Sequence, residues 1–211
     1  MDLKNELEAF AQQMSENAPA EVLNTIASEI GKLSESDLAN NALNVGDKAP
    51  DFMLEDTEGH KISLDTMIAL GSAVISFNRG NWCPFCNIDF KHMQKNIDEI
   101  EASGSNLFVI SPQRKEKSAH LKKENGYEYP ILYDKGNEVA KQFGICFTLS
   151  DELKTIHHSF GMDIPEHNGD ISFELPIPAT YVINSKKEIT YAYINPNWMA
   201  RAEPNNYLKR L

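Results

Sequence analysis

The stretch AVISFNRGNWCPFCNIDFKHMQ, residues 73–94, holds two cysteines between an apolar run and a charged, periodic segment. The apolar run, AVISFN, is nearly uninterrupted, which predicts a strand buried on both faces of a mixed or parallel sheet. The segment after the cysteines has apolar residues at helical spacing as far as Gly104, so it predicts one helix. The cysteines are therefore expected where a buried strand passes into the N-terminus of a helix.

The rest of the sequence repeats this alternation of strands and helices. Strands are predicted in NLFVISP and YPILYD, and helices in RKEKSAHLKKENG and NEVAKQFGI. Near the end, IPATYVINSKKEITYAYIN contains two strands joined by a polar turn, and VGDKAPDFMLEDTEGHKISL contains an earlier hairpin. Parallel units followed by an antiparallel hairpin predict the α/β class, with a mixed central sheet flanked by helices.

Two segments lie outside this alternation. Residues 2–43 contain two amphipathic helices, whose apolar faces are formed by Leu3, Leu7, Phe10 and Met14 and by Val22, Ile26, Ile30 and Leu33. We expect an N-terminal helical extension over residues 1–44 that packs onto a main domain of residues 45–211, with a homodimer contact as the alternative. Residues 147–176 are expected to be an insertion that walls the active-site cleft.

Composition and charge limit the partners. The 211 residues suffice for one substantial core, and 20 Lys and Arg against 31 Asp and Glu give a formal net charge of −11. Such a chain repels a phosphate backbone, so nucleic acid is not an expected partner. No window of about 20 apolar residues occurs, so we expect no membrane contact and a cytoplasmic location. Three cysteines are too few for a disulfide framework and favour thiol chemistry or burial.

The segment from Cys83 to Cys86 has the features of a reactive thiol pair. A thiol at a helix N-terminus lies beside unsatisfied N–H groups and the positive end of the helix dipole, which lowers its pKa. Pro84 suits the first helical turn, and Cys86 lies about one turn further on, within reach of an oxidised Cys83. We interpret Cys83 as the nucleophile and Cys86 as the resolving thiol. A four-ligand zinc site and two inert core cysteines are the alternatives; we expect neither a metal nor a cofactor.

Five segments together resemble a known family: VGDKAPDFML, SFNRGNWCPFC, VISPQ, YPILYDKGNEVAKQFGI and PATYVIN. In this order they resemble the alkyl hydroperoxide reductase and thiol-specific antioxidant family, peroxiredoxin-like proteins on the thioredoxin fold. The resemblance spans about residues 45–211 and is greatest to a branch with a Trp-Cys-Pro-aromatic-Cys motif. It implies that the first cysteine attacks a peroxide O–O bond and becomes a sulfenic acid, which a second thiol converts to a disulfide. It also implies a thioredoxin-like reductant.

Three positions depart from the usual pattern of that family. Ser76 and Gly80 stand where a proline and a hydroxyl residue usually precede the first cysteine, and Pro178 stands where an arginine usually precedes the ATF strand. Pro178 is similar instead to the thioredoxin proline that faces the redox motif in cis, so we predict a cis bond there. Arg79 is the nearest cation to Cys83, and it either stabilises a thiolate or peroxide oxygen or forms an exposed salt bridge.

The remaining candidates are expected to be structural. Trp82 is predicted to pack beside Cys83 as an apolar shelf for substrate or partner. Cys146, at the end of a predicted helix, is expected to be buried and non-catalytic, with a second resolving role as the alternative. A histidine cluster, His157, His158 and His167, is interpreted as packing or surface residues, since adjacent histidines in a helix point to different sides.

The sequence therefore predicts a thiol-dependent peroxidase that reduces hydrogen peroxide or organic hydroperoxides through Cys83 and Cys86. A thioredoxin-like or glutaredoxin-like protein or a small thiol would return the electrons. One alternative is a protein disulfide oxidoreductase that uses the same cysteine pair. Another is a non-enzymatic interaction protein whose cysteines sense oxidation.

Overall fold

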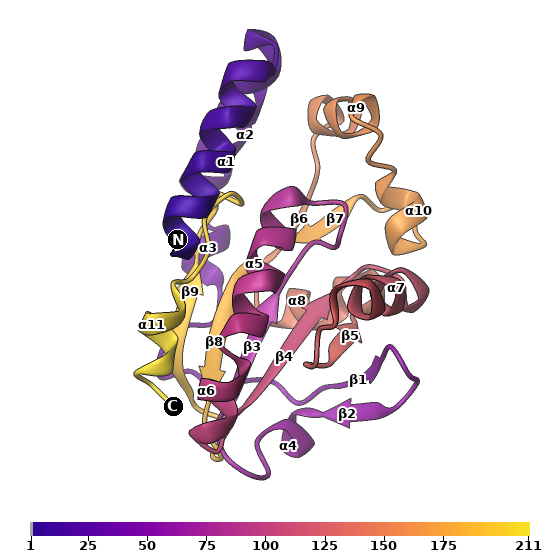
Figure 1. Ribbon diagram of the computed structural model, residues 1–211. Coiled ribbons are helices and arrows are strands. Elements are labelled where there is room, and N and C mark those ends of the chain that lie inside the picture. Colours follow the sequence, from indigo (N-terminus) through magenta and orange to yellow (C-terminus); the bar gives the residue numbers. More distant parts are fainter. Residues whose placement is uncertain (1) are drawn as a thin grey trace.

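The computed structural model describes residues 2–211, so Met1, the first residue of the expected extension, lies outside the described part. Within that part, seven strands form one mixed sheet in the order β2-β1-β5-β4-β3-β8-β9 (Figure 1). Neighbours β3, β4 and β5 run parallel, and the other pairings are antiparallel. The strands are β1 (Met53–Asp56), β2 (Lys61–Ser63), β3 (Ala73–Phe77), β4 (Asn106–Ser111), β5 (Ile131–Tyr133), β8 (Ala179–Ile183) and β9 (Ile189–Ile194).

Helices cover both faces of this sheet. They are α1 (Leu3–Asn17), α2 (Ala20–Glu35), α3 (Leu38–Asn41), α4 (Leu64–Met67), α5 (Pro84–Lys95), α6 (Ile97–Ala102), α7 (Lys115–Asn125), α8 (Glu138–Gln142), α9 (Asp151–Ser159), α10 (Ile164–Asn168) and α11 (Pro204–Leu208), with a 3-10 turn at Lys135–Asn137. The mixed α/β sheet flanked by helices is the predicted fold class. None of the helices described within residues 2–211 is long and apolar enough to cross a membrane.

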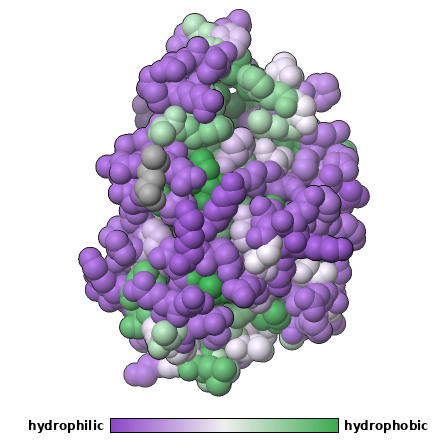
Figure 2. All heavy atoms as spheres, in the orientation of Figure 1, coloured by the Kyte–Doolittle hydropathy of each residue, from purple (hydrophilic) through white to green (hydrophobic). Residues whose placement is uncertain are grey.

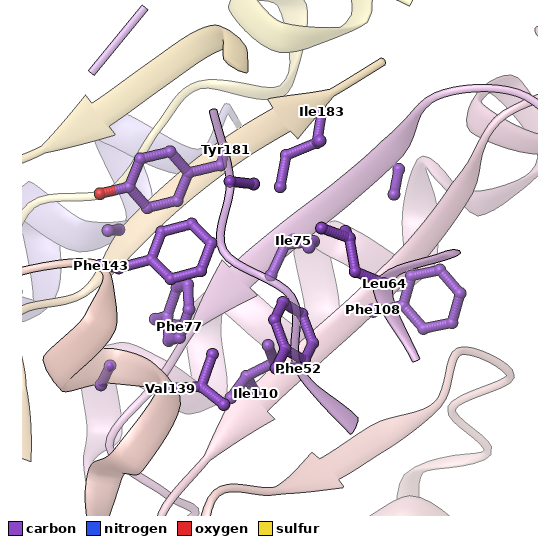
Figure 3. Packing of buried hydrophobic residues seen from close by; sticks show 14 of the residues in the cluster. Phe52, Leu64, Ile75, Phe77, Phe108, Ile110, Val139, Phe143, Tyr181 and Ile183 are labelled. Carbon is purple, nitrogen blue, oxygen red and sulfur yellow. The ribbon is translucent and has the colours of Figure 1, made fainter. Parts of the chain in front are cut away.

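Alternate side chains of the central strand β3 enter two different cores. Ile75 and Phe77 pack with Phe143 and Tyr181 against α4 and α8 on one face (Figure 3). Val74 points to the opposite face, where α1, α5, α6, α7 and α11 pack and where both cysteines of the motif lie. Because side chains alternate along β3, the strand separates the core on one face from the core on the other face that contains Cys83 and Cys86.

The predicted helix after the cysteines is divided in the structure. The helix α5 ends at Lys95 and is capped by Asn96, whose side-chain amide donates to the His92 carbonyl at 2.6 Å, and α6 begins at Ile97. The prediction of one continuous helix as far as Gly104 is therefore wrong in this detail. A side chain that bonds the last carbonyls of a helix competes with continuation of the backbone pattern.

The two predicted N-terminal helices are present as α1 and α2. Leu3 and Leu7 of α1 are buried against the core beneath α5. The segment from 147 to 176 contains α9 and α10, and it also contributes to a two-stranded sheet, β6 (Cys146–Thr148) with β7 (Glu174–Pro176), that was not predicted. In Figure 1, α1 and α2 rise on one side of the sheet's upper end and α9 on the other. The motif therefore lies between these two helical parts.

Candidate active site

The cysteine motif lies at the predicted junction between strand and helix. Cys83 is the N-cap residue of α5, and Pro84 occupies the first helical position, where its missing N–H costs no hydrogen bond. Cys83 and Cys86 are fully buried and neither forms a disulfide. The local structure thus follows from the sequence: a buried strand, a short turn and a proline-initiated helix.

Gly80 explains why this site lacks the family's usual hydroxyl. Its φ of +128° lies outside the range that side-chain-bearing residues favour. A Cβ at this position would lie 2.7 Å from Oε1 of Gln113 and 2.9 Å from Nε1 of Trp82. The same Gln113 oxygen accepts a hydrogen bond from the Asn81 N–H. The turn that brings Trp82 and Cys83 into place therefore excludes serine or threonine at residue 80.

Arg79 is buried beside Cys83, so the alternative of an exposed salt bridge is wrong. Its Nη2 donates to Sγ of Cys83 at 3.0 Å, and the side chain is 3% exposed. The guanidinium carbon lies 5.1 Å from the ring centre of Trp82 and 5.5 Å from that of Trp198, so the two indoles hold it by cation–π contacts. Within residues 2–211, Nε and Nη1 of Arg79 have no hydrogen-bond partner and no carboxylate pairs with the guanidinium.

The surroundings of Cys83 favour its thiolate. Burial alone raises the pKa of a thiol, but hydrogen bonding from Cys86 and the positive charges of Arg79 and Arg201 outweigh burial. The pKa of Cys83 therefore lies well below its usual value. Because the thiolate is the nucleophilic form of cysteine, Cys83 is the activated sulfur of the pair.

Cys86 is held by a second arginine that the sequence reasoning missed. Nη2 of Arg201 donates to Sγ of Cys86 at 3.1 Å, and Nε donates to the buried carboxylate of Asp89 at 3.2 Å. Burial, together with the neighbouring Cys83, raises the pKa of Cys86 well above its usual value, which Arg201 only partly offsets. Burial also raises the pKa of Asp89 to about 6 despite the charge of Arg201. Cys86 is therefore held as a thiol.

A cavity of about 290 Å³ opens next to Cys83. Its wall includes Arg79, Trp82 and Trp198 at the base, and the remaining lining comes mainly from apolar residues of α1, α2 and the segment around α9. Figure 2 shows hydrophobic residues gathered around a hollow between the N-terminal helices and α9. Cys86 does not line this cavity. Only one of the two cysteines, Cys83, therefore lines this cavity.

Pro178 does not take the predicted thioredoxin-like conformation. All peptide bonds within residues 2–211 are trans, so the prediction of a cis bond before Pro178 is wrong. The Ile177 N–H donates to the Ile145 carbonyl at 2.7 Å, and the chain continues extended from β7 into β8. The trans form, favoured by about 0.5–1 kcal/mol for X–Pro bonds, fits this path. Pro178 is buried but does not line the cavity.

Cys146 and the three histidines of the predicted cluster lie in different surroundings. Cys146 is half-buried and packs in the core on the opposite face of the sheet from Cys83, and burial raises its pKa to about 12. His157 and His167 lie against the Trp82 ring, with ring centres 5.5 and 6.5 Å away, whereas His158 is exposed. Adjacent histidines thus point to different sides, as predicted. Within residues 2–211, no three His, Cys, Asp or Glu side chains are arranged to hold a metal ion.

This site lies in a region that matches a known protein family. Residues 45–192 match the model of the AhpC/TSA family. The chain belongs to the AhpC/TSA family. The predicted resemblance to peroxiredoxin-like proteins is confirmed, and this family member is an oxidoreductase of the peroxiredoxin type.

Individual relatives agree with this assignment. This AhpC/TSA family member is 28% identical over 105 residues to "Peroxiredoxin Bcp" of Escherichia coli K12, covering 50% of the chain and 67% of the relative. It is also 31% identical over 101 residues to "Thiol-disulfide oxidoreductase ResA" of Halalkalibacterium halodurans, covering 47% of the chain and 56% of the relative.

Solved structures show the same fold. "Peroxidoxin BcpB" of Mycobacterium tuberculosis superposes with a TM-score of 0.62 at 20% identity, covering 80% of the chain and 96% of that structure. A peroxiredoxin-like protein of Aquifex aeolicus gives a TM-score of 0.63 at 13% identity, covering 80% and 85%. The family member therefore has the predicted thioredoxin-like fold.

Proposed function

We propose that this protein is a thiol-dependent peroxidase in which Cys83 is the nucleophile, Cys86 resolves, and Arg79 and Trp82 contact the substrate. One observation carries the proposal. A single buried guanidinium, Arg79, donates to the Cys83 sulfur through one nitrogen, while its other N–H groups have no partner in the described chain and the residue lines the cavity. These donors are themselves buried, so a peroxide oxygen reaches them, next to the thiolate, through a small movement of the cavity wall.

The first step is oxidation of Cys83. The thiolate attacks the terminal oxygen of a hydroperoxide, an S–O bond forms and the O–O bond breaks, and the departing alkoxide or hydroxide takes up a proton. Negative charge moves from sulfur to the departing oxygen during this step. Arg79 is adjacent to both positions, so its positive charge stabilises the thiolate and the developing anion alike.

Resolution by Cys86 is the second step. The Cys86 sulfur attacks the sulfenic sulfur, an S–S bond forms and water leaves. Cys86 lies one helical turn from Cys83 and is held there by Arg201, which stabilises the thiolate that Cys86 must form to attack. A thioredoxin-like or glutaredoxin-like protein or a small thiol then reduces the disulfide, and this reductant belongs to the proposal.

The alternative of a protein disulfide oxidoreductase has less support. Cys83 is fully buried and its cavity is walled by helices, so a folded protein disulfide reaches the sulfur only if those helices move. The non-enzymatic alternative does not explain the lowered pKa of Cys83 or the unpaired N–H donors of Arg79. Homodimerisation through α1 and α2 remains a prediction.

The domain division also remains a proposal. We propose that residues 1–44 are an extension to a thioredoxin-like domain of residues 45–211, with an insertion at 147–176. The range matched by the family model begins at residue 45, which supports the first boundary. The second rests on the position of α9 and α10 beside the sheet.

Replacing Cys86 by serine tests the chemistry. The reduced Cys86→Ser variant, treated with one equivalent of hydrogen peroxide, should accumulate a Cys83 sulfenic acid that dimedone labels, because oxidation precedes resolution. Turnover should stop after this step. Cys146→Ser is the matched control and should turn over like the parent. A long-lived mixed disulfide with insulin and no sulfenic acid would instead support the oxidoreductase. Parent-like turnover of Cys86→Ser through a Cys83–Cys146 disulfide would overturn the role of Cys86.

A further inference from the structure

We infer that helices α1, α2 and α9 make this site selective for hydroperoxides with a compact, apolar carbon group over hydrogen peroxide. The inference rests on the proposed function, since it concerns the oxidant that Cys83 attacks. Both α1 and α2 lie outside residues 45–192, the range that matches the AhpC/TSA family model. The selectivity is therefore assigned to α1 and α2, which lie outside that range, together with α9, which lies within it.

Helices α1, α2 and α9 enclose the cavity above Cys83. The α1 helix contributes Phe10 and Met14, α2 contributes Val22 and Ile26, and Phe160 follows α9. The two helical parts meet, because α2 contacts α9 directly. Aromatic and aliphatic side chains from both helical parts thus line the same cavity as Cys83.

The volume of the cavity exceeds what hydrogen peroxide needs. One water molecule takes about 30 Å³ in the liquid, so a cavity of about 290 Å³ has room for an organic group as well as the peroxide. It lies near the lower end of the volumes, about 300–1,000 Å³, that bind drug-sized ligands. Hydrogen peroxide would leave most of the apolar wall without contact, whereas a compact alkyl or aryl hydroperoxide would fill it.

The polar groups of the cavity lie where the peroxide would be. Arg79 supplies the unpaired N–H donors next to Cys83. His157 adds no charge at neutral pH, because burial and the charge of Arg79 lower its pKa to about 4. Its Nδ1 donates to the Leu153 carbonyl at 2.7 Å. Apart from Asn17 and His157, the wall away from Arg79 is apolar, which suits an organic hydroperoxide bound with its oxygens toward Arg79.

A single-turnover comparison tests the inference. The second-order rate constant for oxidation of Cys83 is measured with hydrogen peroxide, tert-butyl hydroperoxide and cumene hydroperoxide, and each is divided by the rate constant for free cysteine. Burial of apolar groups gains about fourfold for each methylene, so the corrected rate should rise along this series and exceed the hydrogen peroxide value by about 100-fold for cumene hydroperoxide. A corrected rate that is equal across the series, or highest for hydrogen peroxide, would overturn the inference.

Variants on α2 show whether these helices cause the selectivity. Val22→Glu places a carboxylate in the cavity wall, and the ratio of the cumene hydroperoxide rate to the hydrogen peroxide rate should fall at least about tenfold, since a charge in an apolar wall opposes binding of an apolar group. Ala27→Glu adds the same charge at an exposed position of α2 and should preserve the ratio. Val22→Thr, a gentler change, should lower the ratio about threefold. Circular dichroism checks that each variant keeps its helices.

Failure of the inference differs from failure of the proposed function. If no hydroperoxide oxidises Cys83 faster than it oxidises free cysteine, the peroxidase proposal is wrong. If Cys83 reacts rapidly with every hydroperoxide and Val22→Glu leaves the ratio unchanged, the peroxidase proposal stands and the role of the helices is wrong.

Discussion

Cys83 and Cys86 lie one helical turn apart, and each has an arginine nitrogen close to its sulfur, at 3.0 and 3.1 Å. Their pKa values nevertheless move in opposite directions. Arg201 shares its charge with the carboxylate of Asp89 and with the carbonyls of two further residues. Arg79 lies against the rings of Trp82 and Trp198, donates to the Cys83 sulfur and has no carboxylate partner within residues 2–211. Burial raises both pKa values, but the hydrogen bond between the two sulfurs lowers that of Cys83 and raises that of Cys86, so the coupling of the thiols, together with the arginine charges, decides which sulfur is activated.

The comparison also separates the tasks of the two thiols. Cys83, with the lowered pKa, lines the cavity, whereas Cys86, with the raised pKa, does not line it and shares Arg201 with the carboxylate of Asp89. If both were thiolates, their negative charges would repel at short distance. Each of the following four substitutions changes the surroundings of only one of the two sulfurs, or that sulfur itself.

The largest expected effect is that of Cys83→Ser. A hydroxyl is not ionised near neutral pH and cannot form a sulfenic acid, so peroxide reduction should fall to the rate without protein. Peroxide consumption with a dithiol reductant is the measurement. Activity near that of the parent would show that Cys86, or another group, is the nucleophile.

Loss of the arginine beside Cys83 should have the next largest effect. Arg79→Gln removes the cation that donates to the Cys83 sulfur, and an adjacent opposite charge lowers a pKa by about one to three units. Oxidation of Cys83 at neutral pH should therefore slow by about 10- to 1,000-fold, and the pH profile of its alkylation should move toward higher pH. Arg114→Gln, an arginine paired with Glu166 at the surface, is the control. An unchanged alkylation profile in Arg79→Gln would mean that Cys86 and the helix N-terminus suffice to activate the thiol.

A substitution of His157 tests how strongly the cavity next to Cys83 excludes charge. Burial, with the charge of Arg79, lowers its pKa from 6.5 to about 4, so the folded protein holds it neutral where the unfolded chain is protonated. It therefore contributes stability above pH 6.5 that is lost as the pH falls toward 4, at most about 3 kcal/mol at about 1.4 kcal/mol per pKa unit. Urea unfolding measures the free energy of unfolding of the parent and of His157→Gln across this range. This free energy should fall less with decreasing pH in the variant than in the parent. Equal slopes would contradict the burial argument.

Asp89→Asn should have the smallest effect and acts on the Cys86 side. With the carboxylate gone, the charge of Arg201 is no longer shared, so the pKa of Cys86 should fall by about one unit and the two thiols should become more alike. Ultraviolet absorbance of the thiolates against pH measures both. Because burial raises the pKa of Asp89 to about 6, any inflection near pH 6 in the parent's titration should also disappear. A Cys86 titration in the variant that matches the parent's would show that Asp89 does not influence the pKa of Cys86.

Most of the fold could be predicted because its signals are local. The buried run at 73–78 and the helical spacing after Cys86 place the motif at a strand-to-helix junction with no long-range information. The division of the helix at Asn96 was missed because it depends on one side-chain bond to the His92 carbonyl. The strand from 146 to 148 was missed because it is three residues long and has a partner far away in the sequence.

Half of the candidate site could not be predicted, because it comes from the C-terminal segment. Arg201 is 115 residues from Cys86, and Trp198 lies in an irregular stretch after β9 without periodicity. One signal was available. Asp89 follows Cys86 by three positions on the same buried helical face, and a buried carboxylate requires a cation. The cis prediction for Pro178 was wrong because it transferred a feature of thioredoxin to a chain whose extended β7-to-β8 path does not need it.

The sandwich of Arg79 between two indoles has a spectroscopic consequence. The chain contains two tryptophans, and both of them, Trp82 and Trp198, line the cavity that Cys83 faces. Intrinsic fluorescence excited in the tryptophan band therefore originates entirely from the candidate active site. Oxidation of Cys83, entry of an apolar molecule or displacement of Arg79 would each change the emission of these two rings. The protein carries a built-in optical reporter, and stopped-flow fluorescence can follow each chemical step without an added label.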